Sequence, residues 1–155
     1  MPGSRPLADL PPPSIGAGGG AEGGAPRALP PEMLRGMLEA ARSSLFAGRY
    51  GEAIQAYQAV LKRDPRNVDA ITHLGLIVAI GGHVDSALES LDKALAIDPN
   101  YPPALLYRGQ ILYESKGNRE DAIRSWEKFL ALVPTGEERD RVTKLIAEAK
   151  SGGKK

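Results

Sequence analysis

Residues 48–65 read GRYGEAIQAYQAVLKRDP, and this stretch decides the fold. Its apolar residues recur at spacings of one, three and four, which places them along one face of an α-helix. A glycine that suits a tight turn precedes the helix, and a proline that ends it follows. We therefore predict an amphipathic helix between two residues that interrupt helices. The residues of its apolar face are Ala53, Ile54, Tyr57, Val60 and Leu61.

The same pattern returns twice more along the chain at a nearly constant interval. Residues of several kinds recur with separations of 34 and then 35 residues. A period of this length is the sequence signature of a helix-pair repeat, so the chain is predicted to hold three copies of one repeat. The recurring residues are a glycine (Gly48, Gly82 and Gly117), an alanine (Ala53, Ala87 and Ala122), a bulky residue (Tyr57, Leu91 and Trp126) and a proline (Pro65, Pro99 and Pro134).

Each repeat is predicted to contain two amphipathic helices, and a single helix follows the third repeat. The first helices span roughly 32–47, 67–81 and 101–116, and the second helices span roughly 49–61, 83–97 and 119–133. After Pro134, Thr135 and Glu138 have the spacing of a capping box at the start of a charged helix. We expect this helix, residues 135–150, to cap the exposed end of the repeats. No stretch indicates a strand, so the fold class is all-α.

The two ends of the chain differ in composition from the repeats. Residues 1–31 contain eight prolines and seven glycines, a composition that cannot bury enough apolar surface to offset the entropy of ordering the backbone. We expect a disordered tail or linker there, and the triplet at 11–13 is a less favoured candidate for a polyproline ligand. Residues 151–155 read SGGKK and are expected to form a short flexible basic tail.

Composition excludes several classes of protein. The formal net charge is +1, so no strong field directs the chain toward nucleic acid. Cysteine is absent, which excludes disulfides, thiolate metal sites and a cysteine nucleophile. No apolar stretch approaches the roughly 18 residues of a membrane span. We therefore expect a soluble cytoplasmic protein, or one on the periplasmic side of the inner membrane if an N-terminal anchor is missing; the residue usage suggests a bacterial source.

The repeated residues resemble the tetratricopeptide repeat (TPR), a helix pair of 34 residues. The second repeat carries the family's pattern best, and the third follows it with one extra residue before Gly117. The first repeat departs from the pattern, because Ala40-Ala41 stands in place of Leu-Gly and Ser44 in place of a large residue. The matching residues are Leu74, Gly75, Ala87, Leu91, Ala94 and Pro99 in the second repeat, and Gly109, Ala122, Trp126 and Pro134 in the third.

The resemblance implies a right-handed α-solenoid of three repeats, 32–66, 67–100 and 101–134, with the capping helix at its end. Members of this family are general protein-binding scaffolds with unrelated partners, so the resemblance implies a non-catalytic adaptor without naming its partner. The first helices of such a solenoid line a concave groove, which here is mostly apolar and suits a segment with apolar anchors. The implied groove residues are Leu38, Arg42, Leu45, Thr72, Leu76, Ala79, Leu106, Gln110 and Tyr113.

Two further expectations concern this groove. Some of its residues have packing against a neighbouring repeat or the tail as an alternative role. In addition, one subclass of the family holds the C-terminal carboxylate of heat-shock chaperones with lysine, asparagine and arginine. That clamp is essentially missing here, so a free carboxylate terminus is not the expected ligand. The aligned positions hold Leu38, Arg42, His73, Pro103 and Tyr107.

No residue pattern indicates catalysis, a cofactor or a metal. Serine is present without a nucleophile elbow, and no glycine-rich loop joins a strand to a helix. The histidines, His73 and His83, are expected to be exposed or to cap a helix, and no metal is assigned to them. Trp126 is expected in the core, since it falls at the bulky position of a second helix.

Three interpretations of function remain. The leading one is a scaffold that binds a partner protein or peptide in the groove, as a monomer or weak homo-oligomer. The second rests on residues 126–130, which, with Pro134 and the charged last helix, are similar to bacterial accessory proteins of cytochrome c maturation that hold an apoprotein outside the inner membrane. The third is self-association, in which the groove or the uncapped first repeat stacks on a second copy.

Overall fold

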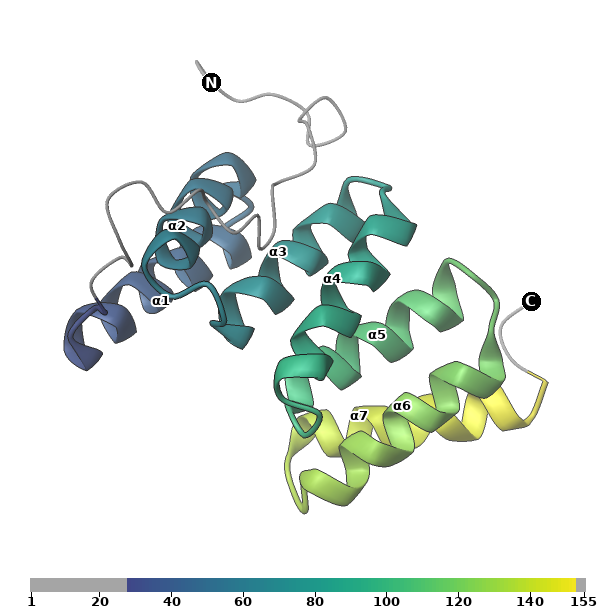
Figure 1. The fold of residues 1–155 in the computed structure, drawn as a ribbon. Helices are drawn as coiled ribbons and strands as arrows, with labels where there is room; N and C mark the ends of the chain where they lie inside the picture. The colour runs from purple at the N-terminus through teal and green to yellow at the C-terminus, as the bar shows by residue number, and fades with distance from the viewer. Residues whose placement is uncertain (1–27, 153–155) are drawn as a thin grey trace. The chain divides into compact units, whose positions relative to one another are not determined.

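The computed structural model describes residues 28–152, and all regular elements within them are α-helices (Figure 1). The all-α prediction is confirmed, and every predicted helix begins and ends within two residues of its expected bounds. Within residues 28–152, none of the helices is long and apolar enough to cross a membrane. The predictions for residues 1–27 and 153–155 lie outside the described residues. The helices are α1 (Pro31–Phe46), α2 (Tyr50–Arg63), α3 (Val68–Ile80), α4 (Val84–Ile97), α5 (Pro102–Glu114), α6 (Arg119–Leu132) and α7 (Glu137–Lys150).

The turn inside each repeat is built on its recurring glycine. These glycines have positive φ angles of 80°, 90° and 65°, a conformation that side chains disfavour. In the first turn the N–H of Arg49 donates to the carbonyl of Ser44 at 2.8 Å, which satisfies the end of α1. In the third, the N–H of Asn118 reaches back to the carbonyl of Leu112 at 2.8 Å. The extra residue of the third repeat therefore lies in its turn, and the glycines concerned are Gly48, Gly82 and Gly117.

The start of α7 differs from the predicted capping box. Thr135 is not the N-cap residue: that position is Gly136, with φ 119° and no side-chain hydrogen bond to the helix. Instead, Nη1 of Arg139 donates to the carbonyls of Leu130 and Val133 at 2.6 and 2.8 Å. The prediction was wrong for two reasons. The positive φ of Gly136 sets the direction in which the chain enters α7, and Arg139 links the start of α7 to the end of α6 by hydrogen bonds.

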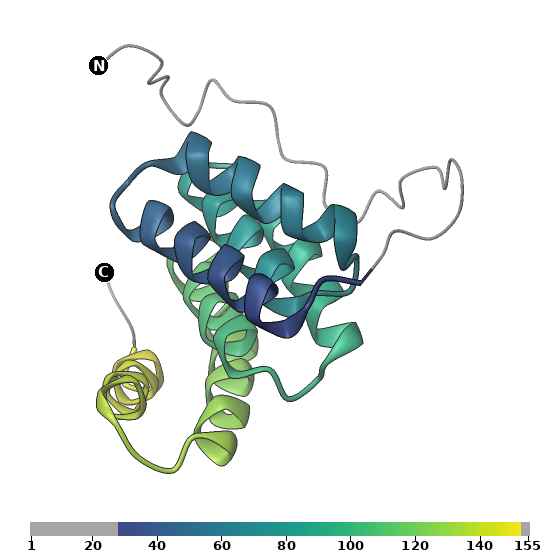
Figure 2. The ribbon, with the colours of Figure 1, turned by 90° about the vertical axis from the view of Figure 1, so that its left-hand side faces the viewer.

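The chain divides into two compact units, which we describe separately. The N-terminal unit extends to Ile97 and holds α1–α4; the C-terminal unit starts at Asp98 and holds α5–α7. In the N-terminal unit α1 packs on α2, α2 on α3, and α3 on α4, with a smaller contact between α1 and α3. Figure 2 shows α1 and α2 side by side as an antiparallel pair. In the C-terminal unit α5 packs on α6, and α7 packs on α6.

The recurring small and bulky residues form the core of each helix pair. The three alanines Ala53, Ala87 and Ala122 have no exposed surface, and neither have Tyr57, Leu91 and Trp126. The core position expected for Trp126 is confirmed. Its indole lies against Gly109, where an added Cβ would overlap the ring and come within 2.7 Å of Cε2. Close approach of α5 and α6 therefore requires glycine at this point.

Candidate protein-binding surface

The nine residues predicted to line a groove lie on α1, α3 and α5, and thus in both compact units. They differ in exposure, which separates residues that a partner can reach from residues that hold the fold. The half-buried ones are Leu38, Arg42, Leu76, Ala79 and Gln110, and the buried ones are Leu45, Thr72, Leu106 and Tyr113.

In the C-terminal unit, Tyr113 has a packing role. Its hydroxyl donates to Oε2 of Glu148 on α7 at 2.9 Å. Its ring meets the ring of Trp126 edge-on, with centroids 5.5 Å apart and an interplanar angle of 63°. These contacts join α5 to α6 of the same repeat and to α7, and a groove role for Tyr113 stays a prediction.

In the N-terminal unit, a row of interacting polar and charged side chains links α1 to α3. Nη1 of Arg42 lies 2.7 Å from Oδ2 of Asp69, and the other carboxylate oxygen lies 2.8 Å from Nδ1 of His73. That nitrogen is also 2.9 Å from the backbone carbonyl of Asp69. Both neighbours are acceptors, so Nδ1 must carry a hydrogen and donate to them. The carboxylate of Asp69 is thus held by a guanidinium on one side and an imidazole on the other.

The expectation that His73 is exposed or caps a helix was wrong. Its side chain is 6% exposed. The imidazole stacks on the ring of Tyr57 at 5.5 Å with an interplanar angle of 5°, and the ring of Phe46 approaches it edge-on at 6.4 Å. The sequence held a signal, because Asp69 stands one helical turn before His73 on the same face. Within residues 28–152 no group of three or more histidines or carboxylates is placed to hold a metal ion.

Three large apolar residues of the N-terminal unit, Met33, Phe46 and Ile80, are exposed although the groove prediction did not include them, and two of these three share one repeat position. Phe46 is 68% exposed and Ile80 is 48% exposed. They occupy the same position in the first two repeats, at the last residues of α1 and α3, and each lies four residues after a predicted groove residue. That spacing was the available signal. We name the accessible apolar surface of α1 and α3 the α1–α3 face, and its residues are Leu38, Phe46, Leu76, Ala79 and Ile80.

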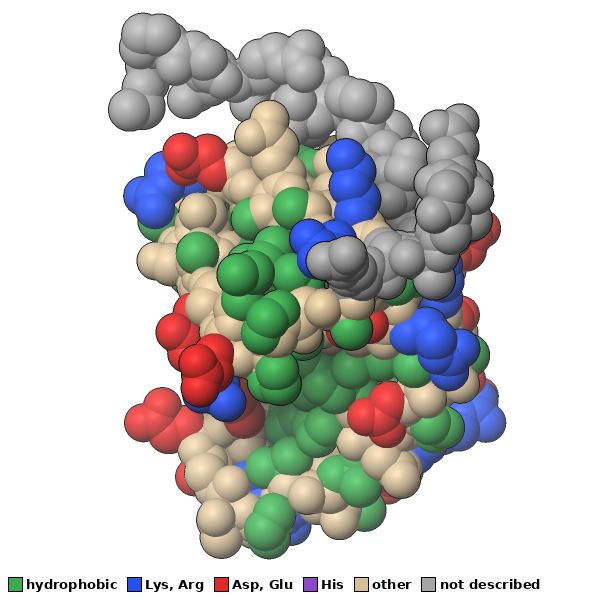
Figure 3. All heavy atoms as spheres, turned by 60° about the vertical axis from the view of Figure 1, so that its left-hand side comes forward, with side chains coloured by type: hydrophobic (Ala, Val, Ile, Leu, Met, Phe, Trp, Pro, Cys, Tyr) green, Lys and Arg blue, Asp and Glu red, His purple; other side chains and the backbone are tan. Residues whose placement is uncertain are grey.

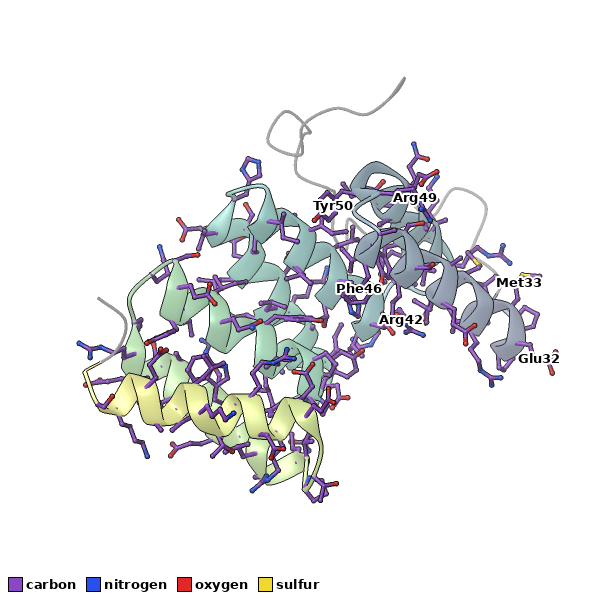
Figure 4. All side chains as sticks on the ribbon, turned by 180° about the vertical axis from the view of Figure 1, so that it is seen from behind. Glu32, Met33, Arg42, Phe46, Arg49 and Tyr50 are labelled. Atoms are coloured by element: carbon purple, nitrogen blue, oxygen red, sulfur yellow. The ribbon has the colours of Figure 1, made fainter. Side chains whose placement is uncertain are left out.

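Apolar side chains make up the α1–α3 face, and the nearby Arg42 and His73 both interact with Asp69. Figure 3, which brings the α1 side of Figure 1 forward, shows apolar side chains gathered between charged ones in its upper part. Figure 4 labels Arg42 and Phe46, which project from the same helix. The guanidinium of Arg42 is engaged by Asp69, and His73 is buried beneath Phe46. At these positions the face offers hydrophobic contact rather than a free cation for a carboxylate.

Helix pairs that repeat with small and bulky core residues at the same positions define the class of protein: a helical-repeat protein. Two models of the tetratricopeptide repeat match this chain, one over residues 38–102 and one over residues 103–136. The chain belongs to the tetratricopeptide repeat family.

Relatives and solved structures share this architecture. The chain is 30% identical over 87 residues to a probable UDP-N-acetylglucosamine–peptide N-acetylglucosaminyltransferase SPINDLY of Solanum lycopersicum, a match that covers 56% of this chain and 9% of that protein. The type III secretion chaperone SycD of Yersinia enterocolitica, in complex with a peptide of the translocator YopD, has a TM-score of 0.66 at 20% identity and covers 79% of this chain and 96% of its own.

A third similar structure is the first TPR of Spaghetti (RPAP3) bound to the HSP90 peptide SRMEEVD. Its TM-score is 0.66 at 21% identity, and the match covers 80% of this chain and 95% of that chain. The chain spans about a tenth of the length of the SPINDLY relative, so the match concerns that part of the relative alone. The similarity to the two solved structures concerns the fold.

Proposed function

We propose that this protein is a non-catalytic scaffold that binds a segment of a partner protein on the α1–α3 face. The observation that carries the proposal is the exposure of Phe46 and Ile80, two large apolar side chains at one repeat position. Exposed apolar side chains that cluster on one face are typical of interaction sites. The complexes of SycD with a YopD peptide and of RPAP3 with an HSP90 peptide support this use of the fold.

The chemistry of the face favours a partner segment with apolar anchors. Burial of apolar surface contributes about 25 cal/mol per Å², so a few large side chains seated beside Phe46 and Ile80 supply most of the favourable energy. A C-terminal carboxylate would instead need free cations. Arg42 forms an ion pair with Asp69, and the imidazole of His73 interacts with the same carboxylate. Neither side chain is therefore free to bind the carboxylate of a partner.

Peptide selection on the immobilised protein, followed by calorimetry of the selected peptides, tests the proposal. We expect the selected peptides to carry apolar residues every three or four positions and to bind at least tenfold more weakly to Phe46→Glu and Ile80→Glu. Gln55→Glu is the matched control, since it adds the same charge at an exposed position of α2. The peptide SRMEEVD serves as the carboxylate probe and is expected to bind weakly.

Two results would refute the proposal. One is unchanged affinity of the selected peptides for both glutamate variants, which would place binding on another surface. The other is a selection dominated by acidic C-terminal sequences together with tight binding of SRMEEVD, which would show that a carboxylate is recognised after all.

A further inference from the structure

A second face of α1 is open and carries no charge. Met33 is 55% exposed, and in Figure 4 its side chain extends outward near the start of the helix. The residues that continue this face along the helix are small or apolar, at spacings of three and four. We name this surface the open α1 face. Its exposed residues are Met33, Gly36, Ala40, Ser43 and Ala47, and its half-buried ones are Met37 and Ser44.

The second repeat shows what normally happens to this face. Of the seven positions 34 residues further along, five lie on α3, the helix on which α2 packs, and these five are buried. The other two, Asn67 and Gly81, cap the ends of α3 and are half-buried. Exposure is 0% for four of the five and 3% for the fifth. The open α1 face is therefore the surface on which a preceding repeat would pack, without a helix of the N-terminal unit covering it. The buried equivalents are Ala70, Ile71, Leu74, Ile77 and Val78.

The chain before α1 is a poor source of such a helix. By the repeat period a preceding second helix would occupy residues 16–29, which contain six glycines and a proline. Each glycine costs about 1 kcal/mol and the proline about 3 kcal/mol relative to alanine in a helix. The other end of the repeats is different, because α7 turns Glu137, Glu138, Arg141 and Lys144 to solvent. One end is closed by a charged helix, whereas the other presents uncharged small residues.

We propose that a second copy of this chain covers the open α1 face, with the two α1 helices antiparallel across a two-fold axis at Ala40. In this register each bulky residue of one copy faces a small one of the other. Met33 meets Ala47 and Met37 meets Ser43, while Gly36 meets Ser44 near the crossing. Small residues at the crossing let two helices approach closely, and a two-fold contact closes at the dimer. None of these pairs brings two charges together.

The open α1 face and the α1–α3 face occupy different sides of α1. Around the helix, Leu38 lies nearly opposite Met33, Gly36 and Ala40, whereas Phe46 lies roughly 80–140° from them. The dimer therefore leaves Leu38 accessible in both copies. The inference does not depend on the proposed function, and the two can fail independently.

Sedimentation equilibrium over a concentration series tests the dimer. The wild-type chain is expected to approach twice its 16.5 kDa mass as concentration rises, and Ala40→Glu is expected to remain at the monomer mass throughout. Ala40 is exposed, so far-UV circular dichroism should show unchanged helicity for this variant. Gln55→Glu adds the same charge on α2 and is expected to dimerise like the wild type.

A cross-link locates the two-fold axis. The chain has no cysteine, so Ala40→Cys introduces a single thiol that should form a disulfide-linked dimer under mild oxidation, because the two Cα atoms meet at the axis. Gln55→Cys is expected to cross-link far more slowly at the same concentration. The proposal is overturned if the wild type is a monomer at every concentration, if Ala40→Glu dimerises normally, or if the two cysteine variants cross-link equally.

Discussion

The helix pairs α3–α4 and α5–α6 approach each other at the same repeat position, which is a glycine in both. The side chains that face this glycine differ greatly between the two pairs. At Gly75 an added Cβ would lie 3.2 Å from Cβ of Ser90 and 3.5 Å from Cδ2 of Leu91. At Gly109 it would overlap the indole of Trp126. The first repeat already carries an alanine at this position, Ala41, which is fully buried. The need for glycine thus depends on the bulky residue across from it, not on the repeat position alone.

The largest expected effect is removal of the indole itself. Trp126→Ala should lower the free energy of unfolding by about 3–5 kcal/mol, because it leaves a large cavity between α5 and α6. Urea denaturation followed by circular dichroism measures the change, with Glu127→Ala as the control at the exposed neighbouring residue. A loss below about 1 kcal/mol, in the range of surface substitutions, would show that Trp126 does not hold the C-terminal unit together.

Gly109→Ala comes next, with an expected loss of about 1–3 kcal/mol from overpacking against Trp126. A double-mutant cycle tests whether this loss depends on the indole of Trp126. In the background of Trp126→Leu, which copies the Leu91 of the second repeat, the loss caused by Gly109→Ala should shrink. Equal losses in the two backgrounds would mean that the indole is not what excludes a side chain at this position.

Gly75→Ala should have the smallest effect, within about 1 kcal/mol of wild type in either direction. The new methyl group would touch Ser90 and the backbone carbonyl of Ala87 at 3.2–3.4 Å, which is tight, while alanine gains about 1 kcal/mol of helix propensity over glycine. The same urea titration gives the value. A loss as large as that of Gly109→Ala would contradict the difference drawn between the two crossings.

Much of the fold could be predicted from the sequence because its signals are local and repeated. Gly48 and Pro65, with their equivalents in the other repeats, mark turns and helix ends, and the alanine and bulky positions mark the core. The failure at Thr135 has a physical reason. A capping box is recognised by spacing alone, whereas Gly136 adopts a φ angle of 119° and Arg139 supplies the bonds that link α7 to α6.

The candidate site was harder to predict from the sequence than the fold, because the exposure of a residue depends on which other helix packs against it. The resemblance to the tetratricopeptide repeat implies that Leu38 and Leu76 lie on the binding stripe, and they are half-buried in the structure. Phe46 and Ile80 continue that stripe, but an apolar residue at helical spacing looks the same in sequence whether a neighbouring helix covers it or not. The opposite holds for His73, a residue expected to be exposed or to cap a helix. It is buried because the rings of Tyr57 and Phe46, on two other helices, pack against it.

The glycine turns described above also have a stereochemical meaning. At Gly48, Gly82 and Gly117 the backbone adopts the hand of a mirror-image amino acid, and no atom beyond the adjacent residues lies within 4 Å of where a side chain would start. A D-residue would occupy these φ angles at no steric cost, whereas an L-residue would cost about 1–2 kcal/mol. The separations of 34 and 35 residues are therefore also the distances between these three points of reversed backbone hand, and each of the three turns a helix back on its partner.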